Sequence, residues 1–245
     1  MFNLFKKKVN CELISNFQKI NFQKNILSTS KDDFFFEDYK SEFLDFENLS
    51  LDVSIFSIYR NILKNYDKLL FESSKINCDL FIVNSGFVGR EYFKTCSMSI
   101  ENVNLVSVPI LFEVLNGEGY FLIQDKNNSS NLKLIKVNKG SKVLIPINFI
   151  YTIINSSETE KLVCLSLKDS LFDYKFKVLE KKFGGVLYFT KNNGFIRNQN
   201  YLPSYHLEEF EGSYLGDYSF NLDKSIYKEF IDIPEKFNFL KNNSI

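Results

Sequence analysis

The chain has 245 residues with 30 basic and 30 acidic side chains, so its formal net charge is zero, and it carries a single histidine. The balanced charge argues against a general nucleic-acid-binding protein, because such proteins carry an excess of basic residues on one face. One histidine excludes any metal site or mechanism that needs two imidazoles.

Cysteine spacing and hydropathy bear on where the protein works. The four cysteines are far apart and include no C-x-x-C pair (Cys11, Cys78, Cys96 and Cys164). This spacing is typical of reduced thiols in a cytoplasmic protein and argues against disulfides or a zinc site. No run approaches the roughly 18 apolar residues that a membrane span requires, and no apolar segment of signal-peptide length follows the first lysines. We therefore expect neither a membrane span nor secretion.

Residues 1–50 are polar and irregular, apart from an acidic and aromatic patch at residues 32–38, DDFFFED. We expect an extended N-terminal arm whose phenylalanines lie against a core. A peptide that binds a partner protein is the alternative for the same patch. Residues 51–63 mix β-branched and aromatic side chains, which predicts a strand followed by a turn or a short helix.

From Cys78 onward, short runs rich in Val, Ile, Phe and Tyr recur between turn-forming residues. The runs span residues 78–83, 90–95, 110–115, 119–124, 132–137, 142–146, 151–155, 162–167 and 185–189. Regularly spaced short strands indicate an all-β sandwich or barrel. Helical spacing of apolar residues over 223–241, interrupted by Pro234, predicts one or two short helices outside the barrel. We therefore expect three parts, an N-terminal arm, a barrel domain and a C-terminal extension (1–50, 51–200 and 201–245).

The spacing within residues 140–155, GSKVLIPINFIYTIIN, is informative. A glycine is followed by five residues, a proline, a turn, and a strand that ends at Asn155. This order and these intervals resemble the second cupin motif. In this sequence Asn148 replaces the motif's second glycine and Tyr151 replaces its histidine.

Residues 110–120, ILFEVLNGEGY, run as a strand into a Gly-x-Gly hairpin turn and out again. The first cupin motif ends with a glutamate, six residues and a glycine, and the same interval separates Ile110 from Gly117. Two matched spacings in order, within a series of short strands, indicate a cupin jelly-roll barrel.

Three longer segments resemble the cupin-type phosphoglucose (glucose-6-phosphate) isomerases. They read CDLFIVNSGFVGREYFKT from Cys78, PILFEVLNGEGYFLIQ from Pro109 and DYKFKVLEKKFGGVLYFTKNNGF from Asp173. The similarity extends over residues 54–197. It implies a jelly-roll barrel, usually a homodimer, that interconverts glucose 6-phosphate and fructose 6-phosphate with a divalent metal such as iron, manganese or zinc in the barrel.

The resemblance also places the family's site residues on this sequence. The family's threonine matches Thr95. Its four metal ligands, three histidines and a glutamate, fall on side chains of other types, in chain order Met98, Ile100, Ile110 and Tyr151. Thr95 and Tyr151 are therefore the candidate substrate-binding residues. An alignment shifted by one residue places Ser97 and Ser99 at the first two ligand positions, and neither alignment supplies an imidazole.

These substitutions remove the donors that a divalent metal requires. Iron, manganese or zinc needs several N, O or S donors, at about 2.0–2.2 Å for nitrogen and oxygen. Because side chains alternate between the two faces of a strand, Glu113 points away from the barrel interior and does not replace the lost carboxylate. The side chains expected to point into the barrel form the inward set: Met98, Ile100, Ile110, Phe112, Tyr151 and Ile153. We expect them to pack as an apolar core that contains one phenol, whose hydroxyl is hydrogen-bonded.

We therefore predict a metal-free, catalytically inactive homologue of cupin-type glucose-6-phosphate isomerase, a pseudoenzyme without a cofactor. It is expected to act in the cytoplasm as a homodimer or as a structural or regulatory subunit of a larger protein assembly. The alternatives are a divergent isomerase and a module that binds sugar phosphate. A polar cavity at Tyr151 would favour ligand binding, whereas tight packing would favour a scaffold. We expect His206 at the surface and Cys96 as a buried structural cysteine.

Overall fold

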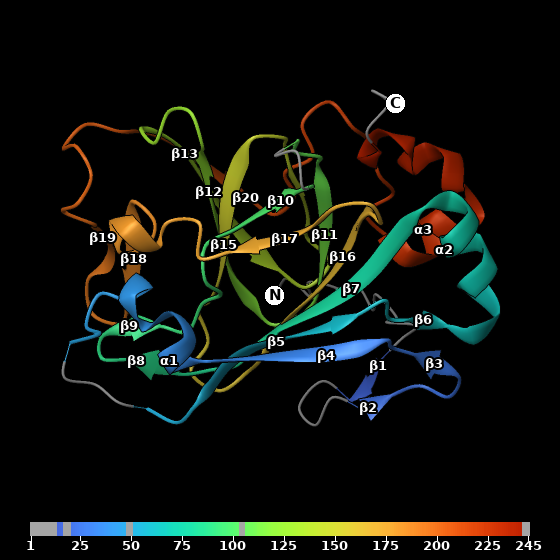
Figure 1. The fold of residues 1–245 in the computed structure, drawn as a ribbon, viewed down its shortest axis with the longest axis horizontal. Coiled ribbons are helices and arrows are strands. Elements are labelled where there is room, and N and C mark those ends of the chain that lie inside the picture. Colours follow the sequence, from blue (N-terminus) through green and yellow to red (C-terminus); the bar gives the residue numbers. More distant parts are fainter. Residues whose placement is uncertain (1–13, 17–20, 48–50, 103–105, 242–245) are drawn as a thin grey trace, which may run out of the picture.

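The computed structural model describes residues 14–16, 21–47, 51–102 and 106–241. Two six-stranded sheets face each other and enclose a hydrophobic core, as Figure 1 shows. This arrangement confirms the predicted all-β jelly-roll barrel. Three parts of the expected N-terminal arm lie outside the described residues, namely residues 1–13, 17–20 and 48–50.

The first sheet has the strand order β17-β10-β15-β12-β13-β20 and is antiparallel except for the parallel pair of β13 and β20. In chain order its strands are β10 (Met98–Glu101), β12 (Glu118–Asp125), β13 (Asn131–Asn138), β15 (Phe149–Asn155), β17 (Asp173–Phe176) and β20 (His206–Glu211). Strand β20 belongs to the predicted C-terminal extension, so the extension supplies an edge strand as well as helices. Its first residue, His206, is exposed as expected.

The second sheet has the order β14-β11-β16-β7-β5-β4 and is antiparallel throughout. In chain order its strands are β4 (Ser30–Phe35), β5 (Ser54–Arg60), β7 (Ile76–Val83), β11 (Ile110–Asn116), β14 (Lys142–Ile145) and β16 (Leu162–Asp169).

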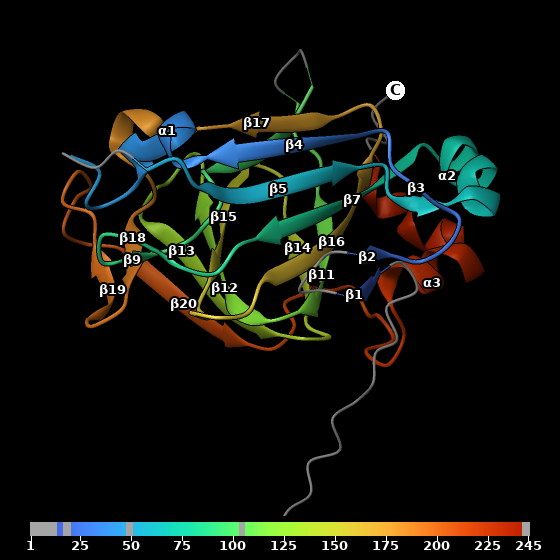
Figure 2. The same cartoon turned by 90° about the horizontal axis from the view of Figure 1, so that it is seen from below.

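Strand β4 contains the first part of the acidic and aromatic patch. Phe34 pairs with Phe56 of β5, and their rings stack with centroids 4.2 Å apart. The phenylalanine lies against the core as expected, but the segment is a hydrogen-bonded edge strand of the sheet and not a detached arm. Figure 2 shows β17 lying beside β4 where the two sheets meet, and Phe34 contacts Phe176 of β17 there.

Two turns account for the motif spacings. Strands β11 and β12 are joined at Gly117, whose φ of 81° is a left-handed conformation that glycine adopts without steric cost. Asn148, which replaces the motif's glycine just before β15, has a φ of 63°. Asparagine is among the few other residues that adopt this conformation readily, so the turn survives the substitution.

The remaining elements are short. A four-stranded sheet of order β19-β18-β9-β8 lies at one end of the barrel (Figure 1). Its strands are β8 (Phe87–Val88), β9 (Glu91–Tyr92), β18 (Leu187–Thr190) and β19 (Gly194–Arg197). The strand predicted at 90–95 is therefore only two residues long. Two small sheets contain β1 (Ile14–Asn16) with β2 (Asn21–Phe22), and β3 (Ile26–Leu27) with β6 (Leu63–Lys64).

The helices are α1 (Phe36–Tyr39), α2 (Lys68–Ser74) and α3 (Ile226–Asp232), with 3-10 helices η1 (Lys40–Glu42), η2 (Asn65–Asp67), η3 (Glu180–Lys182) and η4 (Pro234–Leu240). The predicted tail helices are thus present, and Pro234 begins the second of them. Among the described residues, no helix is long and apolar enough to cross a membrane.

The second sheet is covered on both faces. Its inner face packs against the first sheet, and its outer face packs against apolar residues of α2, α3 and η4. Every residue of β16 is consequently buried. The barrel interior and the outer face under the helices are two separate cores, and successive residues of β11 alternate between them, with Ile110 and Phe112 in the first and Leu111 and Leu115 in the second.

Candidate functional site

The four residues predicted to stand at the family's ligand positions come together in the barrel interior. Met98 of β10 pairs directly with Tyr151 of β15, and Ile100 and Ile110 belong to the same core. None of the four is more than 3% exposed. Phe112 and Ile153 belong to this core as well, so the predicted inward set is confirmed.

Thr95 is fully buried immediately before this site. Its hydroxyl oxygen accepts a hydrogen bond from the backbone N–H of Ile153 at 3.0 Å, and its own backbone N–H donates to the Ile153 carbonyl oxygen at 2.9 Å. Both bonds attach the segment before β10 to β15. A role of Thr95 in binding substrate stays a prediction.

Tyr151 fills the centre of the barrel. Its ring packs edge-on against Phe112 with centroids 5.5 Å apart, and the residue is 1% exposed. Within the described chain its hydroxyl has no hydrogen-bond partner, so the expectation of a hydrogen-bonded phenol is wrong. Burial raises the pKa of Tyr151 well above its usual value, with a further contribution from Cys96. The phenol is therefore neutral and unsuited to acid–base work near neutral pH.

The residues at these positions do not fit a divalent metal ion. A thioether, two hydrocarbon side chains and a neutral phenol lack the carboxylate and imidazole donors that iron, manganese or zinc binds. In the described ranges, no group of three or more His, Cys, Asp or Glu residues is placed to hold a metal. Cys96 is buried as expected, and burial raises the pKa of its thiol. Glu113 lies on the outer face of the sheet, as strand parity predicts, and is buried there.

Along several strands of the second sheet, the side chains that face the barrel interior change from apolar to polar at one open end of the barrel, here called its mouth. On β4, β5, β7 and β16, the side chain two residues beyond a residue of the barrel core (Phe34, Ile58, Phe81 and Cys164) is polar and has the same orientation. The polar side chains are Asp32 on β4, Arg60 on β5, Asp79 on β7, and Ser166 and Lys168 on β16. A polar pocket of about 400 Å³ opens at this mouth and includes all of these residues except Ser166.

Tyr174 of β17 connects the mouth to the barrel interior. Its hydroxyl donates to the carboxylate of Asp79 at 2.8 Å and lies 3.2 Å from the hydroxyl of Ser166. The other carboxylate oxygen of Asp79 accepts from the backbone N–H of Asn61 at 2.8 Å. Tyr174 pairs with Ile100 across β10 and β17, so this network lies next to the degenerate metal positions.

The two cations of the mouth already have partners. The Arg60 guanidinium donates to Asp32 at 2.8 Å and to Asp173 at 3.1 Å, and it lies over the Tyr174 ring at 4.7 Å from the centroid. The Lys168 ammonium donates to the carbonyl oxygen of Phe172 at 2.5 Å. Burial lowers the pKa of Lys168, although nearby aspartates oppose this shift.

The sequence reasoning missed this polar mouth. The signal in the sequence was the alternation of side chains along a strand, in which residues two apart share a face. Asp79 is two residues before Phe81, and Lys168 is two residues after Ser166, so each member of a pair faces the same way. That signal becomes useful only once the inward parity of each strand is known. Which strand ends share one mouth depends on sheet order.

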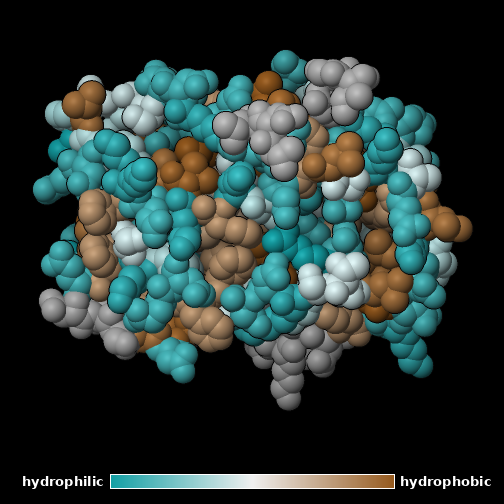
Figure 3. All heavy atoms as spheres, viewed as in Figure 1, coloured by the Kyte–Doolittle hydropathy of each residue, from teal (hydrophilic) through white to brown (hydrophobic). Residues whose placement is uncertain are grey.

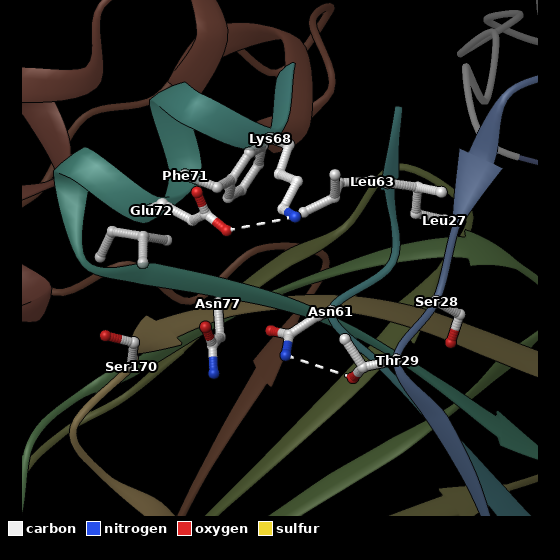
Figure 4. A pocket seen from close by; sticks show the side chains of 11 residues that line it. Leu27, Ser28, Thr29, Asn61, Leu63, Lys68, Phe71, Glu72, Asn77 and Ser170 are labelled. Carbon is white, nitrogen blue, oxygen red and sulfur yellow. Dashed lines mark hydrogen bonds and ion pairs between the residues drawn. The ribbon is translucent and has the colours of Figure 1, made fainter. Parts of the chain in front are cut away.

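A second pocket lies outside the barrel, against α2, and measures about 500 Å³ (Figure 4). Its apolar wall comes from the outer core, through Leu63, Phe71 and Ile76. At its rim Lys68 and Glu72 form an ion pair at 3.6 Å, which Figure 4 shows across the helical turn. This pocket contains none of the positions that the sequence singled out.

The fold is a jelly-roll barrel with a buried hydrophobic centre, which includes Met98, Ile100, Ile110 and Tyr151. A family model described as glucose-6-phosphate isomerase (GPI) matches residues 38–206, which is well over half of the chain. The chain therefore belongs to the glucose-6-phosphate isomerase family, as the resemblance predicted. No curated protein matches the chain.

Solved structures match only in part. A vicilin from Solanum lycopersicum (tomato) is 15% identical, over 49% of this chain and 31% of its own, with a TM-score of 0.36. A vicilin from Solanum melongena is 12% identical over 51% and 31%, with a TM-score of 0.39. A salicylate 1,2-dioxygenase from Pseudaminobacter salicylatoxidans is 14% identical over 42% and 26%, with a TM-score of 0.30. The chain thus spans between about a quarter and a third of the length of these proteins.

Proposed function

We propose that this member of the glucose-6-phosphate isomerase family does not isomerise sugar phosphates by metal-dependent chemistry and serves as a structural or regulatory subunit of a larger assembly. One observation carries the proposal. The four positions predicted to align with the family's metal ligands are Met98, Ile100, Ile110 and Tyr151; all four are buried in the hydrophobic core of the barrel, and none of them carries a carboxylate or an imidazole.

The chemistry of the reaction supports this reading. Moving a hydrogen between C1 and C2 of a sugar requires a base at the carbon or a cation that polarises both oxygens. Tyr151 is a neutral phenol in the barrel centre. The carboxylate of Glu113 lies on the other face of the sheet, and that of Asp79 is held by Tyr174 and the backbone of Asn61.

Supporting features for an assembly and a cytoplasmic location are less specific. Large apolar side chains are well exposed at Tyr66, Leu69 and Leu202, which are 70%, 78% and 75% exposed. On the face in Figure 3, hydrophobic residues form small separate groups among hydrophilic ones. Cys96 and Cys164 are buried and reduced, which fits the cytoplasm. We propose a homodimer as the simplest assembly, to be tested by sedimentation at several protein concentrations.

Isomerase activity on fructose 6-phosphate is the decisive test of the first proposal. The assay is run with added manganese or iron and after chelation, on protein whose fold is verified by circular dichroism, with a metal-dependent isomerase as a positive control. We expect no turnover under any condition. Turnover that chelation abolishes would overturn the proposal, and turnover that survives chelation would make Tyr151 the first residue to mutate.

Binding of a small polar ligand at the barrel mouth is the second candidate function. The observation that favours it is the polar pocket with Arg60 and Lys168 beside the degenerate metal positions. Guanidinium and ammonium groups bind phosphate, and a sugar phosphate is the ligand that the family suggests. Because both cations already have partners, the hydroxyl groups of the sugar would have to contribute much of the affinity.

Calorimetric titration with glucose 6-phosphate, and separately with glucose and inorganic phosphate, tests this second candidate. We expect saturable binding that Lys168→Gln weakens at least fivefold. Lys175→Gln, which changes an exposed lysine on neighbouring β17, is the matched control. Absence of saturable binding to all three compounds would remove this candidate and leave the scaffold proposal in place.

A further inference from the structure

The pocket against α2 and the polar pocket at the mouth have part of their lining in common. Thr29, Asn61, Asn77 and Ser170 line both of them, and these four residues are here named the polar strip. The two pockets measure about 500 and 400 Å³, and each volume lies within the range of small-molecule sites in proteins. A ligand that occupies both pockets must therefore cross the polar strip.

The polar strip runs across the ends of four neighbouring strands. In the second sheet, β16, β7, β5 and β4 lie side by side in that order. Ser170 directly follows β16, Asn77 is the second residue of β7, Asn61 directly follows β5, and Thr29 directly precedes β4. Figure 4 shows the four side chains in this order across the view, from Ser170 to Thr29, with α2 above them. The strip is thus the end of the sheet, between the outer core and the mouth.

The side chains of the polar strip retain hydrogen-bonding capacity for a ligand. The Asn61 amide nitrogen donates to the Thr29 hydroxyl at 3.3 Å, which leaves the amide oxygen and a second N–H of Asn61 for other partners. No hydrogen bond joins the side chains of Asn77 or Ser170 to the other residues drawn in Figure 4. Amide and hydroxyl groups together donate and accept, so the strip matches the hydroxyl groups of a carbohydrate.

The pocket against α2 favours an apolar group. Leu63 and Phe71 of the outer core line it, together with Leu27, which is 39% exposed. Its charged lining residues, Lys68 and Glu72, form an ion pair with each other at 3.6 Å. An ionic ligand group would have to compete with this pair, whereas an apolar group gains free energy by removing apolar surface from water.

The mouth favours hydroxyl groups over a further charge. Arg60 donates to Asp32 and Asp173, and Lys168 donates to the carbonyl oxygen of Phe172. Each carboxylate has about four acceptor sites and a guanidinium about five N–H donors, so these paired groups retain capacity for hydroxyl groups. A sugar in the mouth can therefore be bound without breaking an ion pair.

We propose, building on the second candidate function in which the mouth binds a sugar, that the two pockets together bind a glycoside. The sugar lies in the mouth, and the apolar aglycone, the group attached through the glycosidic oxygen, lies against Leu27 and Leu63 under α2. The glycosidic bond crosses the polar strip, where Asn61 and Asn77 bind hydroxyl groups of the sugar. The site thereby prefers a glycoside to the free sugar, which has no group to fill the apolar pocket.

Calorimetric titration with methyl β-D-glucoside and with phenyl β-D-glucoside tests the proposal, and glucose 6-phosphate is titrated in parallel. The two glucosides contain the same sugar and differ only in the aglycone. Because the phenyl ring buries more apolar surface than the methyl group, we expect phenyl β-D-glucoside to bind at least about tenfold more tightly.

Two substitutions assign the two parts of the ligand to the two pockets. Leu27→Asn makes the wall of the apolar pocket polar, so it should reduce the advantage of the phenyl compound to under about threefold and leave binding of the methyl compound unchanged. Asn77→Ala removes a hydrogen-bonding side chain from the polar strip and should weaken binding of both glucosides at least about threefold.

The matched controls are Leu202→Asn and Asn192→Ala, which change exposed residues that line neither pocket. Neither control should alter binding of either glucoside. Circular dichroism verifies that every variant is folded before it is titrated.

Three results would overturn the proposal. Equal affinity for the two glucosides would remove the aglycone pocket. An advantage of the phenyl compound that Leu27→Asn does not reduce would place the aglycone elsewhere. Failure of both glucosides to bind would reject the glycoside, and glucose 6-phosphate then tests the second candidate function separately. If glucose 6-phosphate binds while the glucosides do not, only the glycoside proposal fails.

Discussion

Two tyrosines in one barrel core offer a matched test of the structure. The hydroxyl of Tyr151 is buried without a hydrogen-bond partner in the described chain, whereas the hydroxyl of Tyr174 donates to Asp79 at 2.8 Å. Replacing each by phenylalanine removes one oxygen atom and leaves the ring in place. The two substitutions should therefore change stability in opposite directions.

The magnitudes follow from the contacts. A buried polar group without a partner costs about 1–3 kcal/mol, so Tyr151→Phe should raise the free energy of unfolding by about 1 kcal/mol after the small void is allowed for. A hydrogen bond to a charged group contributes about 1.5–3 kcal/mol, so Tyr174→Phe should lower the free energy of unfolding by about 2 kcal/mol or more. The two variants should differ by about 3 kcal/mol.

Equilibrium unfolding in urea, followed by circular dichroism, measures both changes. The slope of the unfolding free energy against urea should be the same in all three proteins, because the exposed surface hardly changes. A Tyr151→Phe variant that is less stable than the natural protein would refute the reasoning. That result would mean that the hydroxyl has a partner in solution, such as a buried water or a bound ligand, and it would shift the balance toward the binding hypothesis.

Three further substitutions test the fold around the site. Gly119→Ala places a Cβ 2.0 Å from the carbonyl oxygen of Ile154, so we expect a loss of at least about 2 kcal/mol in urea unfolding. Asn155→Ala removes amide bonds to three backbone carbonyls, at 3.1, 3.0 and 2.8 Å, and a loss under about 1 kcal/mol would contradict their role in closing the loop after β15. Lys94→Met leaves Glu91 buried without its cation and should cost about 3–5 kcal/mol, seen as a lower melting temperature; an unchanged melting temperature would argue against the buried ion pair.

The sequence was informative wherever a local rule decides the outcome. The period of two along β11 placed Ile110 and Phe112 in the barrel and Glu113 on the other face, and the structure has them there. The motif intervals predicted the turn at Asn148, where a left-handed conformation is required. These predictions depend only on backbone geometry and strand parity, which are properties of neighbouring residues.

The sequence was less informative where partners come from distant segments. The N-terminal patch has the composition of an arm, yet β4 pairs with β5 because the sheet edge was available for hydrogen bonding. The outward position of Glu113 was predicted, but its burial was not, because α3 covers it from more than a hundred residues away. The tail was predicted to be helical without any indication of which face it covers.

By itself, the amino-acid sequence determined the fold class and the inward set around Tyr151, because strand parity and turn conformation are local properties; the replacement of the family's metal ligands stays a prediction from the alignment of the motifs. Only the tertiary structure decided that Asp79, Arg60, Lys168 and Tyr174 meet at one mouth, that the Tyr151 hydroxyl has no partner among the described residues, and that Glu113 lies beneath a helix. The physical reason is that hydrogen bonding and burial depend on which strands and helices become neighbours, and strand order is set by packing over the whole chain.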